Sequence, residues 1–134
     1  MPAQSPDSPG DVVVDASDGI VRMRLSGSPS AAHLRASFVT LRELLARHSP
    51  RLLLIDGSGV AKTTGEMREV LRTEATSVEF DRQAIIGIPP AERVFARIVA
   101  RLTFKHDRMQ FYATEAEALR WLNELRVNEL RGPR

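Results

Sequence analysis

Hydroxyl side chains that could accept a phosphate gather in the stretch "SGVAKTT", which lies between an apolar run and a helical pattern. A phosphate on Thr63 would add nearly two negative charges. The neighbouring Lys62, and the N-terminus of a helix that starts here, would both stabilise those charges. Thr64 and Ser58 are further candidates for the same modification. We therefore treat all four as candidate phosphoacceptor or partner-binding residues.

Thr63 also has a purely structural interpretation. Thr63 and Glu66 have the spacing of a capping box, in which the hydroxyl accepts from a first-turn N–H and the carboxylate reaches back. The spacing predicts a helix that begins at Thr63, with this residue as an N-cap that contributes about 1 kcal/mol to stability. Capping alone is one interpretation of Thr63, and a phosphorylation switch is the other.

Asp56 ends the apolar run "RLLLID" and is followed by "GSG". Ligands of open α/β sheets bind at the carboxyl ends of strands. Together with the strand ends at residues 88–89 and 112–113, Asp56 and Ser58 could rim a pocket or meet a partner. The glycine spacing matches neither a P-loop nor a dinucleotide fingerprint, so turn formation is the alternative interpretation.

Three arginines, Arg93, Arg97 and Arg101, follow one another at intervals of four, and we call them the arginine row. This spacing places them on one face of a helix. Extended by Lys105, the row could meet an acidic partner or anionic lipid headgroups. The alternative is the ordinary solvated face of an amphipathic helix. We treat the row as a candidate anionic-partner patch.

Other chemistry finds no support in the sequence. The chain has no cysteine, which excludes thiolate ligands and cysteine nucleophiles. His33, His48 and His106 lie far apart and show none of the spacings of metal-binding pairs. No serine lies in a nucleophile-elbow motif. We expect no catalytic residue, no cofactor and no metal, and predict that the protein is not an enzyme.

The elements that must position these residues follow from hydrophobic periodicity. Short alternating or continuous apolar runs predict strands. Apolar residues at intervals of three and four predict helices. The predicted strands are "DVVVDA", "IVRMRLSG", "RLLLID", "RQAIIGI" and "RMQFYA", and the predicted helices cover about residues 30 to 47 and begin near Thr63, "PP" and Thr114.

The predicted order is β-β-α-β-α-β-α-β-α, an α/β sandwich with a mixed sheet of about five strands and about four helices. Strands separated by helices imply right-handed crossovers and a largely parallel core, with the opening hairpin on one side. In the third helix we expect a strong apolar face opposite the arginine row, formed by Val94, Phe95, Ile98, Val99 and Leu102.

Length and composition fit one globular domain of 134 residues, with a disordered leader over 1–10 and the domain over 11–131. With 19 basic and 17 acidic side chains the net charge is only +2, so we expect no nucleic-acid binding. No apolar run reaches the ~18 residues of a membrane span. Because the first residues also lack a signal-peptide pattern, we expect a cytoplasmic protein.

Three patterns in this element order resemble the STAS family, the fold of bacterial anti-sigma-factor antagonists and of sulfate-transporter C-terminal domains. They are an Asp-containing strand end at 56–60, the "AIIG" strand at 84–87 and the acidic helix "EALRWL" at 117–122. The chain looks most like stand-alone bacterial STAS-like proteins, and the resemblance covers about residues 11–125. It implies the STAS sandwich as the fold.

In the antagonists, an Asp-Ser-Ser-Gly turn starts the helix after the third strand, and a partner kinase phosphorylates its first serine. The residues that match this turn are Lys62-Thr63-Thr64-Gly65. The resemblance therefore implies that Thr63 stands where the antagonists carry their switch. Two departures bear on the partner surface: Lys62 replaces the acidic residue, and the loop from Asp56 is about two residues shorter.

The resulting hypothesis is a non-enzymatic regulatory or protein-interaction module with a STAS-like fold, phosphorylated at Thr63 and bound to a protein partner. The alternative is a small-molecule or lipid carrier. Related domains are grouped with folds that bind apolar ligands, and "VFARIVARLTF" supplies more apolar surface than one stripe requires. A homodimer through an exposed helix face is a further expectation.

Overall fold

The computed structural model describes residues 10–103 and 105–130, so the predicted leader lies almost entirely outside the described residues. The order of elements is the one predicted from the sequence. The strands are β1 (Asp11–Ser17), β2 (Ile20–Gly27), β3 (Leu52–Val60), β4 (Arg82–Ile86) and β5 (Met109–Tyr112). The helices are α1 (Ala31–Ala46), α2 (Gly65–Ala75), α3 (Pro90–Leu102) and α4 (Glu115–Leu130), with a short 3-10 turn, η1, at His106–Arg108.

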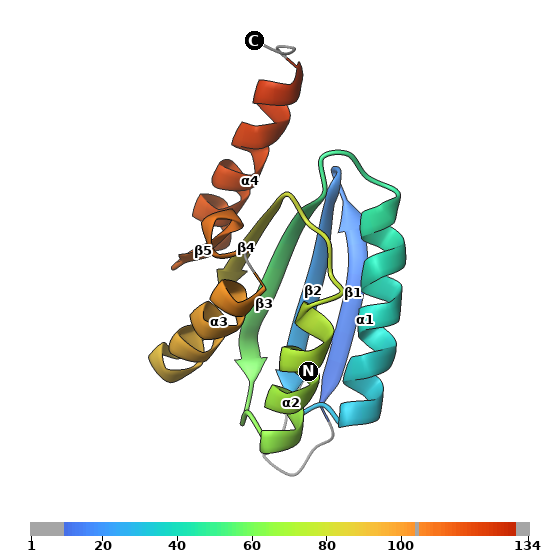
Figure 1. Ribbon diagram of the computed structural model, residues 1–134, viewed down its shortest axis with the longest axis vertical. Helices are drawn as coiled ribbons and strands as arrows, with labels where there is room; N and C mark the ends of the chain where they lie inside the picture. Colours follow the sequence, from blue (N-terminus) through green and yellow to red (C-terminus); the bar gives the residue numbers. More distant parts are fainter. Residues whose placement is uncertain (1–9, 104, 131–134) are drawn as a thin grey trace, which may run out of the picture.

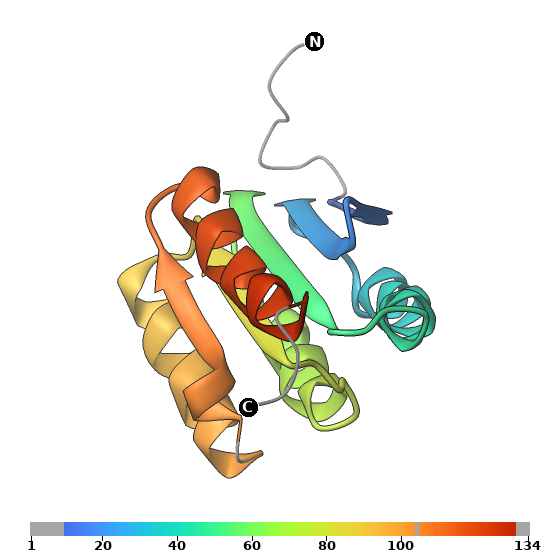
Figure 2. The same ribbon diagram turned by 90° about the horizontal axis from the view of Figure 1, so that it is seen from above.

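The five strands form one sheet in the order β1-β2-β3-β4-β5. β1 and β2 are an antiparallel hairpin, and every later pair is parallel. Because right-handed crossovers that always step in the same direction place their helices on the same face, α1, α2 and α3 share one side of the sheet. The last helix, α4, covers the opposite side (Figures 1 and 2).

Alternation along β3 divides the apolar side chains between two cores. Leu53 points toward α1 and α2, where it is buried with Met23 and Leu41. Leu52 and Leu54 point the other way and are buried against Leu122 of α4. Both faces of the central strand are therefore covered, which explains why "RLLLID" is a continuous apolar run rather than an alternating one.

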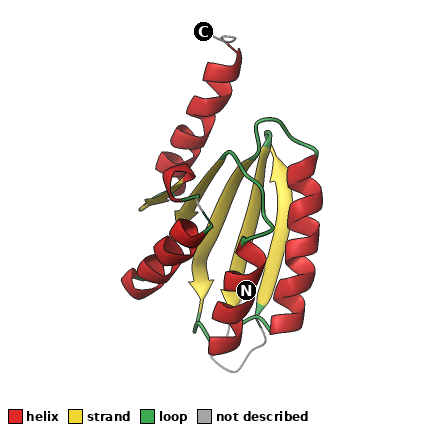
Figure 3. Cartoon of the chain, viewed as in Figure 1, coloured by secondary structure: helices red, strands yellow, loops and turns green. Residues whose placement is uncertain are grey.

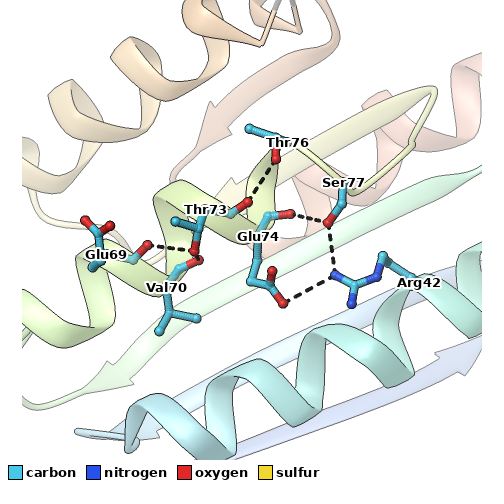
Figure 4. A network of polar contacts seen from close by, with 7 residues as sticks. All are labelled: Arg42, Glu69, Val70, Thr73, Glu74, Thr76 and Ser77. Carbon is cyan, nitrogen blue, oxygen red and sulfur yellow. Dashed lines mark hydrogen bonds and ion pairs between the residues drawn. The ribbon is translucent and has the colours of Figure 1, made fainter.

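A polar network joins α1 to the end of α2 (Figure 4). The Arg42 guanidinium lies 3.5 Å from the Glu74 carboxylate and 3.1 Å from the Ser77 hydroxyl. The Ser77 hydroxyl also donates to the Glu74 carbonyl at 3.0 Å, which satisfies one of the last carbonyls of the helix. These contacts fix the spacing of the two helices over the sheet.

The strong apolar face predicted for α3 is only partly covered by the rest of the fold. Of its five residues, Phe95 and Val99 are partly buried. Val94, Ile98 and Leu102 instead remain 57%, 53% and 71% exposed. The physical reason is the position of α3 at the β5 end of the sheet, away from α1 (Figure 2), where β5 is only 4 residues long. One short edge strand and α2 cannot cover an apolar arc this wide.

Candidate functional site

The loop between β3 and α2 is anchored to the end of β2. The Ala61 N–H donates to the Gly27 carbonyl at 2.9 Å, and the Ser28 hydroxyl donates to the Lys62 carbonyl at 2.8 Å. Figure 3 shows this loop leaving the carboxyl end of β3 and entering α2 at the same end of the sheet. The two hydrogen bonds therefore place the candidate switch residues at the edge where ligands of α/β sheets bind.

The helix that follows is capped by Thr64, not by Thr63 as the sequence predicted. The Thr64 backbone is extended, and its hydroxyl accepts from the Met67 N–H at 3.1 Å. Because the Lys62 carbonyl is held by Ser28, the chain turns into the helix one residue later than the capping-box spacing indicates. Met67 is then fully buried. Thr63 lies outside the capping interaction, half-buried between Lys62 and the cap.

Asp56 and Ser58 form a local turn. The Asp56 carboxylate accepts from the Ser58 N–H at 2.9 Å and from its hydroxyl at 2.6 Å. Asp56 is in register with Arg24 and Ile86 on the strands beside it. By the alternation along β3 it belongs to the α4 side, whereas Thr63 lies on the α2 side. The structure therefore separates Asp56 from Lys62, Thr63 and Thr64, although it joins Asp56 to Ser58.

The turn is fitted closely to the end of β4. Gly87 has a φ of +71°, and a Cβ there would meet the Ser58 backbone nitrogen at 2.4 Å. Glycine is required at this position both for the backbone conformation and for the close approach. The "AIIG" and "DGSG" motifs are thus two halves of one packed corner, and this structural role accounts for Asp56 and Ser58.

A cavity of about 480 Å³ lies between the sheet and helices α2 and α3. Its walls are mainly apolar, and Ser58, Lys62 and Thr63 lie among the lining residues at the carboxyl end of the strands. The interior is lined by side chains from β2, β3, α1 and α3, including Met23, Phe38, Leu53, Ile55, Phe95 and Val99. The structure brings Ser58, Lys62 and Thr63 together at this cavity, and Thr64 next to it as the cap.

Helix α3 is tied to α2 at both ends of the cavity. At one end, the Arg68 guanidinium of α2 makes two hydrogen bonds to the Glu92 carboxylate of α3. This contact, chiefly through its hydrogen bond and also through its charge, raises the pKa of Arg68. At the other end, the Lys105 ammonium group donates to the Ala75 carbonyl at 3.2 Å and to the Val78 carbonyl. Neither tie is predictable from the sequence, because neither pair has a periodic spacing.

The arginine row does not present three equivalent charges. The Arg93 guanidinium donates to the Ile88 carbonyl at 3.1 Å and is partly buried. Arg97 lies over the Phe111 ring at 5.0 Å but stays exposed, as does Arg101. Arg93 thus fixes the start of α3. Arg97 and Arg101 carry the charge of the row at the surface.

Among the side chains that the structure describes, no three from His, Asp or Glu gather closely enough to hold a metal ion. Among the helices described, none is long and apolar enough to cross a membrane.

The chain has a SpoIIAA-like fold, as its similarity to solved structures shows. An uncharacterized protein with a SpoIIAA-like fold from Shewanella loihica matches with a TM-score of 0.63 and 19% identity, over 85% of this chain and 94% of that one. An anti-sigma factor antagonist from Mycobacterium paratuberculosis matches with a TM-score of 0.59 and 22% identity, over 89% and 97%. The unphosphorylated antagonist SpoIIAA matches with a TM-score of 0.52 and 14% identity, over 86% and 96%.

Comparison of sequences adds nothing to this likeness: no family model and no curated protein matches the chain. The STAS resemblance predicted from the motifs is therefore confirmed as a fold by the structural matches.

Proposed function

We propose that the protein is a non-enzymatic regulatory module that binds a protein partner through the β3–α2 loop and α2, with Thr63 as a phosphorylation switch. The observation that carries the proposal is the position of Thr63, one residue before the N-cap of α2 and beside Lys62. The likeness to anti-sigma factor antagonists supports a regulatory role, since two of the matched structures carry that description. Cytoplasmic location and homodimerisation stay predictions.

The local electrostatics favour a phosphate on Thr63. Thr64 supplies the cap, so a modification of Thr63 leaves the start of α2 intact. The helix N-terminus and Lys62 both attract negative charge. A phosphate adds between one and two charges and three acceptor oxygens at the rim of the cavity, and this changes the surface that a partner meets.

The test is phosphorylation by an extract of the host supplied with ATP, followed by intact mass and peptide mapping. We expect one phosphate on Thr63 of the wild-type chain and none on Thr63→Ala. Modification of Thr64 or Ser58 alone, or an unmodified chain, would contradict the switch. For the partner, Thr63→Glu mimics the charge, and Thr63→Gln is the matched uncharged control. Identical partner binding by the two variants would also count against the proposal.

A second candidate function, carriage of a small apolar molecule, rests on the cavity. Its volume of about 480 Å³ falls within the range of small-molecule sites, and its walls are largely apolar with a few polar groups. Ala96 of α3 lines it. We expect Ala96→Phe to fill part of the space and to weaken binding of a fluorescent apolar probe. Val39→Phe, on the exposed side of α1, is the control and should bind the probe as wild type does.

A further inference from the structure

Helix α3 carries an apolar stripe on its outer surface. Val94, Ile98 and Leu102 follow at intervals of four, and each is more than half exposed. Residues at this spacing lie one above the other on one side of a helix. Three large aliphatic side chains thus form a continuous exposed strip. In the part of the chain that the structure describes, the other exposed large apolar residues, Val13, Val39 and Val127, lie on three different elements.

Positive charge runs beside this apolar stripe. Arg97 lies three residues after Val94, and Arg101 lies three residues after Ile98, so the row and the stripe are neighbouring strips on the same helix. Arg97 and Arg101 are exposed. From residue 90 to 108 the chain has five basic side chains against two acidic ones, and the acidic Glu92 is already paired with Arg68. The net charge of this segment is therefore positive.

The other side of α3 faces the cavity. Phe95, Ala96, Val99 and Ala100 all line it. Ile98 and Leu102 lie three residues after Phe95 and Val99, so the apolar arc of α3 runs without interruption from the outer surface to the cavity wall. Aliphatic side chains flanked by arginine on an exposed helix are the composition of helices that lie in the interface of a membrane.

We propose that α3 docks the protein on the surface of an anionic bilayer, with the apolar stripe entering the acyl boundary and Arg97 and Arg101 at the lipid headgroups. Charge complementarity selects this occupant. A second copy of the chain would bring the same arginine-rich surface toward itself, so like charges oppose that pairing. A bilayer matches both strips at once, because its acyl boundary accepts the aliphatic side chains and its anionic headgroups attract the arginines.

The docking is tested by sedimentation of the full chain with lipid vesicles. One set contains phosphatidylcholine alone, and the other contains phosphatidylcholine with phosphatidylglycerol. We expect binding to the anionic vesicles, weaker binding at high salt because of charge screening, and little binding to the neutral ones. Substituting Arg97→Gln and Arg101→Gln together should weaken binding about thirtyfold, since each arginine near an anionic surface contributes about fivefold.

The apolar stripe is tested by Ile98→Ser combined with Leu102→Ser. We expect at least about a tenfold loss of vesicle binding with unchanged thermal unfolding, because both side chains are exposed. The matched control is Arg35→Gln combined with Val39→Ser, since these two residues are exposed at the same spacing on α1. The control should bind within about twofold of wild type.

Several results would overturn the docking. One is absence of binding to anionic vesicles, and another is an equal loss of vesicle binding in the α1 control. A third is a wild-type dimer that the combined Ile98→Ser and Leu102→Ser substitutions dissociate. The last would assign the stripe to a second copy of the chain. Thr63→Glu should bind vesicles as wild type does. This variant separates the docking from the proposed switch, because either one can fail without the other.

Discussion

At the residue scale, the start of α2 assigns different surroundings to two adjacent threonines. Thr64 is extended, and its hydroxyl accepts from the Met67 N–H. Thr63 stands one residue earlier, at the rim of the cavity. The difference arises from the hydrogen bond between Ser28 and the Lys62 carbonyl, which holds the loop in place before the helix begins.

This assignment predicts unequal effects of two otherwise identical substitutions. Thr64→Ala should lower the free energy of unfolding by about 1 kcal/mol, because the Met67 N–H loses its capping partner. Thr63→Ala should lower it by less than about 0.5 kcal/mol. Urea unfolding of both variants measures the difference. A larger loss of unfolding free energy for Thr63→Ala than for Thr64→Ala would show that Thr63 is the N-cap.

Tyr112 provides a test of burial on the α4 side of the sheet. Its ring lies 5.9 Å from that of Trp121, and the Arg82 guanidinium stacks over the same Trp121 at 4.7 Å. Burial raises the pKa of Tyr112, because the charged phenolate is disfavoured away from water, and the Glu124 carboxylate raises it further. Tyr112 is the one tyrosine of the chain, so its absorbance can be followed without interference.

We expect tyrosinate absorbance to titrate above the ordinary value of about 10 in the folded protein. A raised pKa means that the folded state holds the proton more tightly than the unfolded state does. The contribution to stability is therefore complete below about pH 10 and is lost as the pH rises through the folded pKa. Tyr112→Phe should remove this loss of folding stability at alkaline pH. Equal pH dependence of unfolding in both proteins would contradict the burial.

At the scale of the elements, α3 is held to its neighbour by side chains more than by a packed core. The pair Arg68–Glu92 joins it to α2 at one end, and Lys105 joins the following segment to the α2 C-terminus at the other. Between these points lies the cavity. A helix with few buried apolar contacts opens locally more readily than one in the core.

Breaking the first tie should loosen α3 without unfolding the protein. Arg68→Met keeps the aliphatic stem and removes the charge, so the midpoint of urea unfolding should change little, because an exposed ion pair contributes little to stability. Amide hydrogen exchange in α3 should nevertheless become faster. Arg72→Met is the matched control, because Arg72 pairs with Glu69 within α2. Equal exchange in the two variants would show that the tie does not restrain α3.

Local signals account for the elements that the sequence predicted well. The helix predicted to begin near Thr114 does so, and the Glu117 N–H donates to the Thr114 hydroxyl at 3.2 Å. Ser30 caps α1 in the same way. Each of these depends only on residues within one turn, so spacing suffices.

The remaining features depend on contacts distant in sequence. Thr63 is not the N-cap that its spacing predicted, because Ser28, 34 residues before Lys62, fixes the loop. The stripe of α3 is exposed because of what the neighbouring β5 and α2 leave uncovered, which periodicity along α3 does not contain. The arginine row was predicted as a strip, but the bond from Arg93 to the Ile88 carbonyl was not. The sequence predicted the candidate phosphoacceptor or partner-binding residues Thr63, Lys62 and Ser58. It did not predict that they line one cavity.

At the scale of the whole molecule, the sheet separates two cores that share few side chains. Leu41 is buried on the α1 side, and Ile20 is buried on the α4 side. Leu41→Ala should lower the free energy of unfolding by about 2–5 kcal/mol, and Ile20→Val by about 0.5–1.5 kcal/mol. Because the two sites belong to different clusters, the loss of unfolding free energy in the double variant should equal the sum of the two single losses within about 0.5 kcal/mol. A larger deviation in urea unfolding would show that the sheet transmits repacking between them.

The strand order has a consequence for how the chain is made. Each strand after β1 pairs with the strand that precedes it in the chain, so each strand emerges from the ribosome after its partner. The helices α1, α2 and α3 can cover their face in the same succession. The opposite face, with Leu52, Leu54 and Ile86, stays uncovered until α4, the last element, emerges. During translation this face is where the nascent chain needs protection from other molecules.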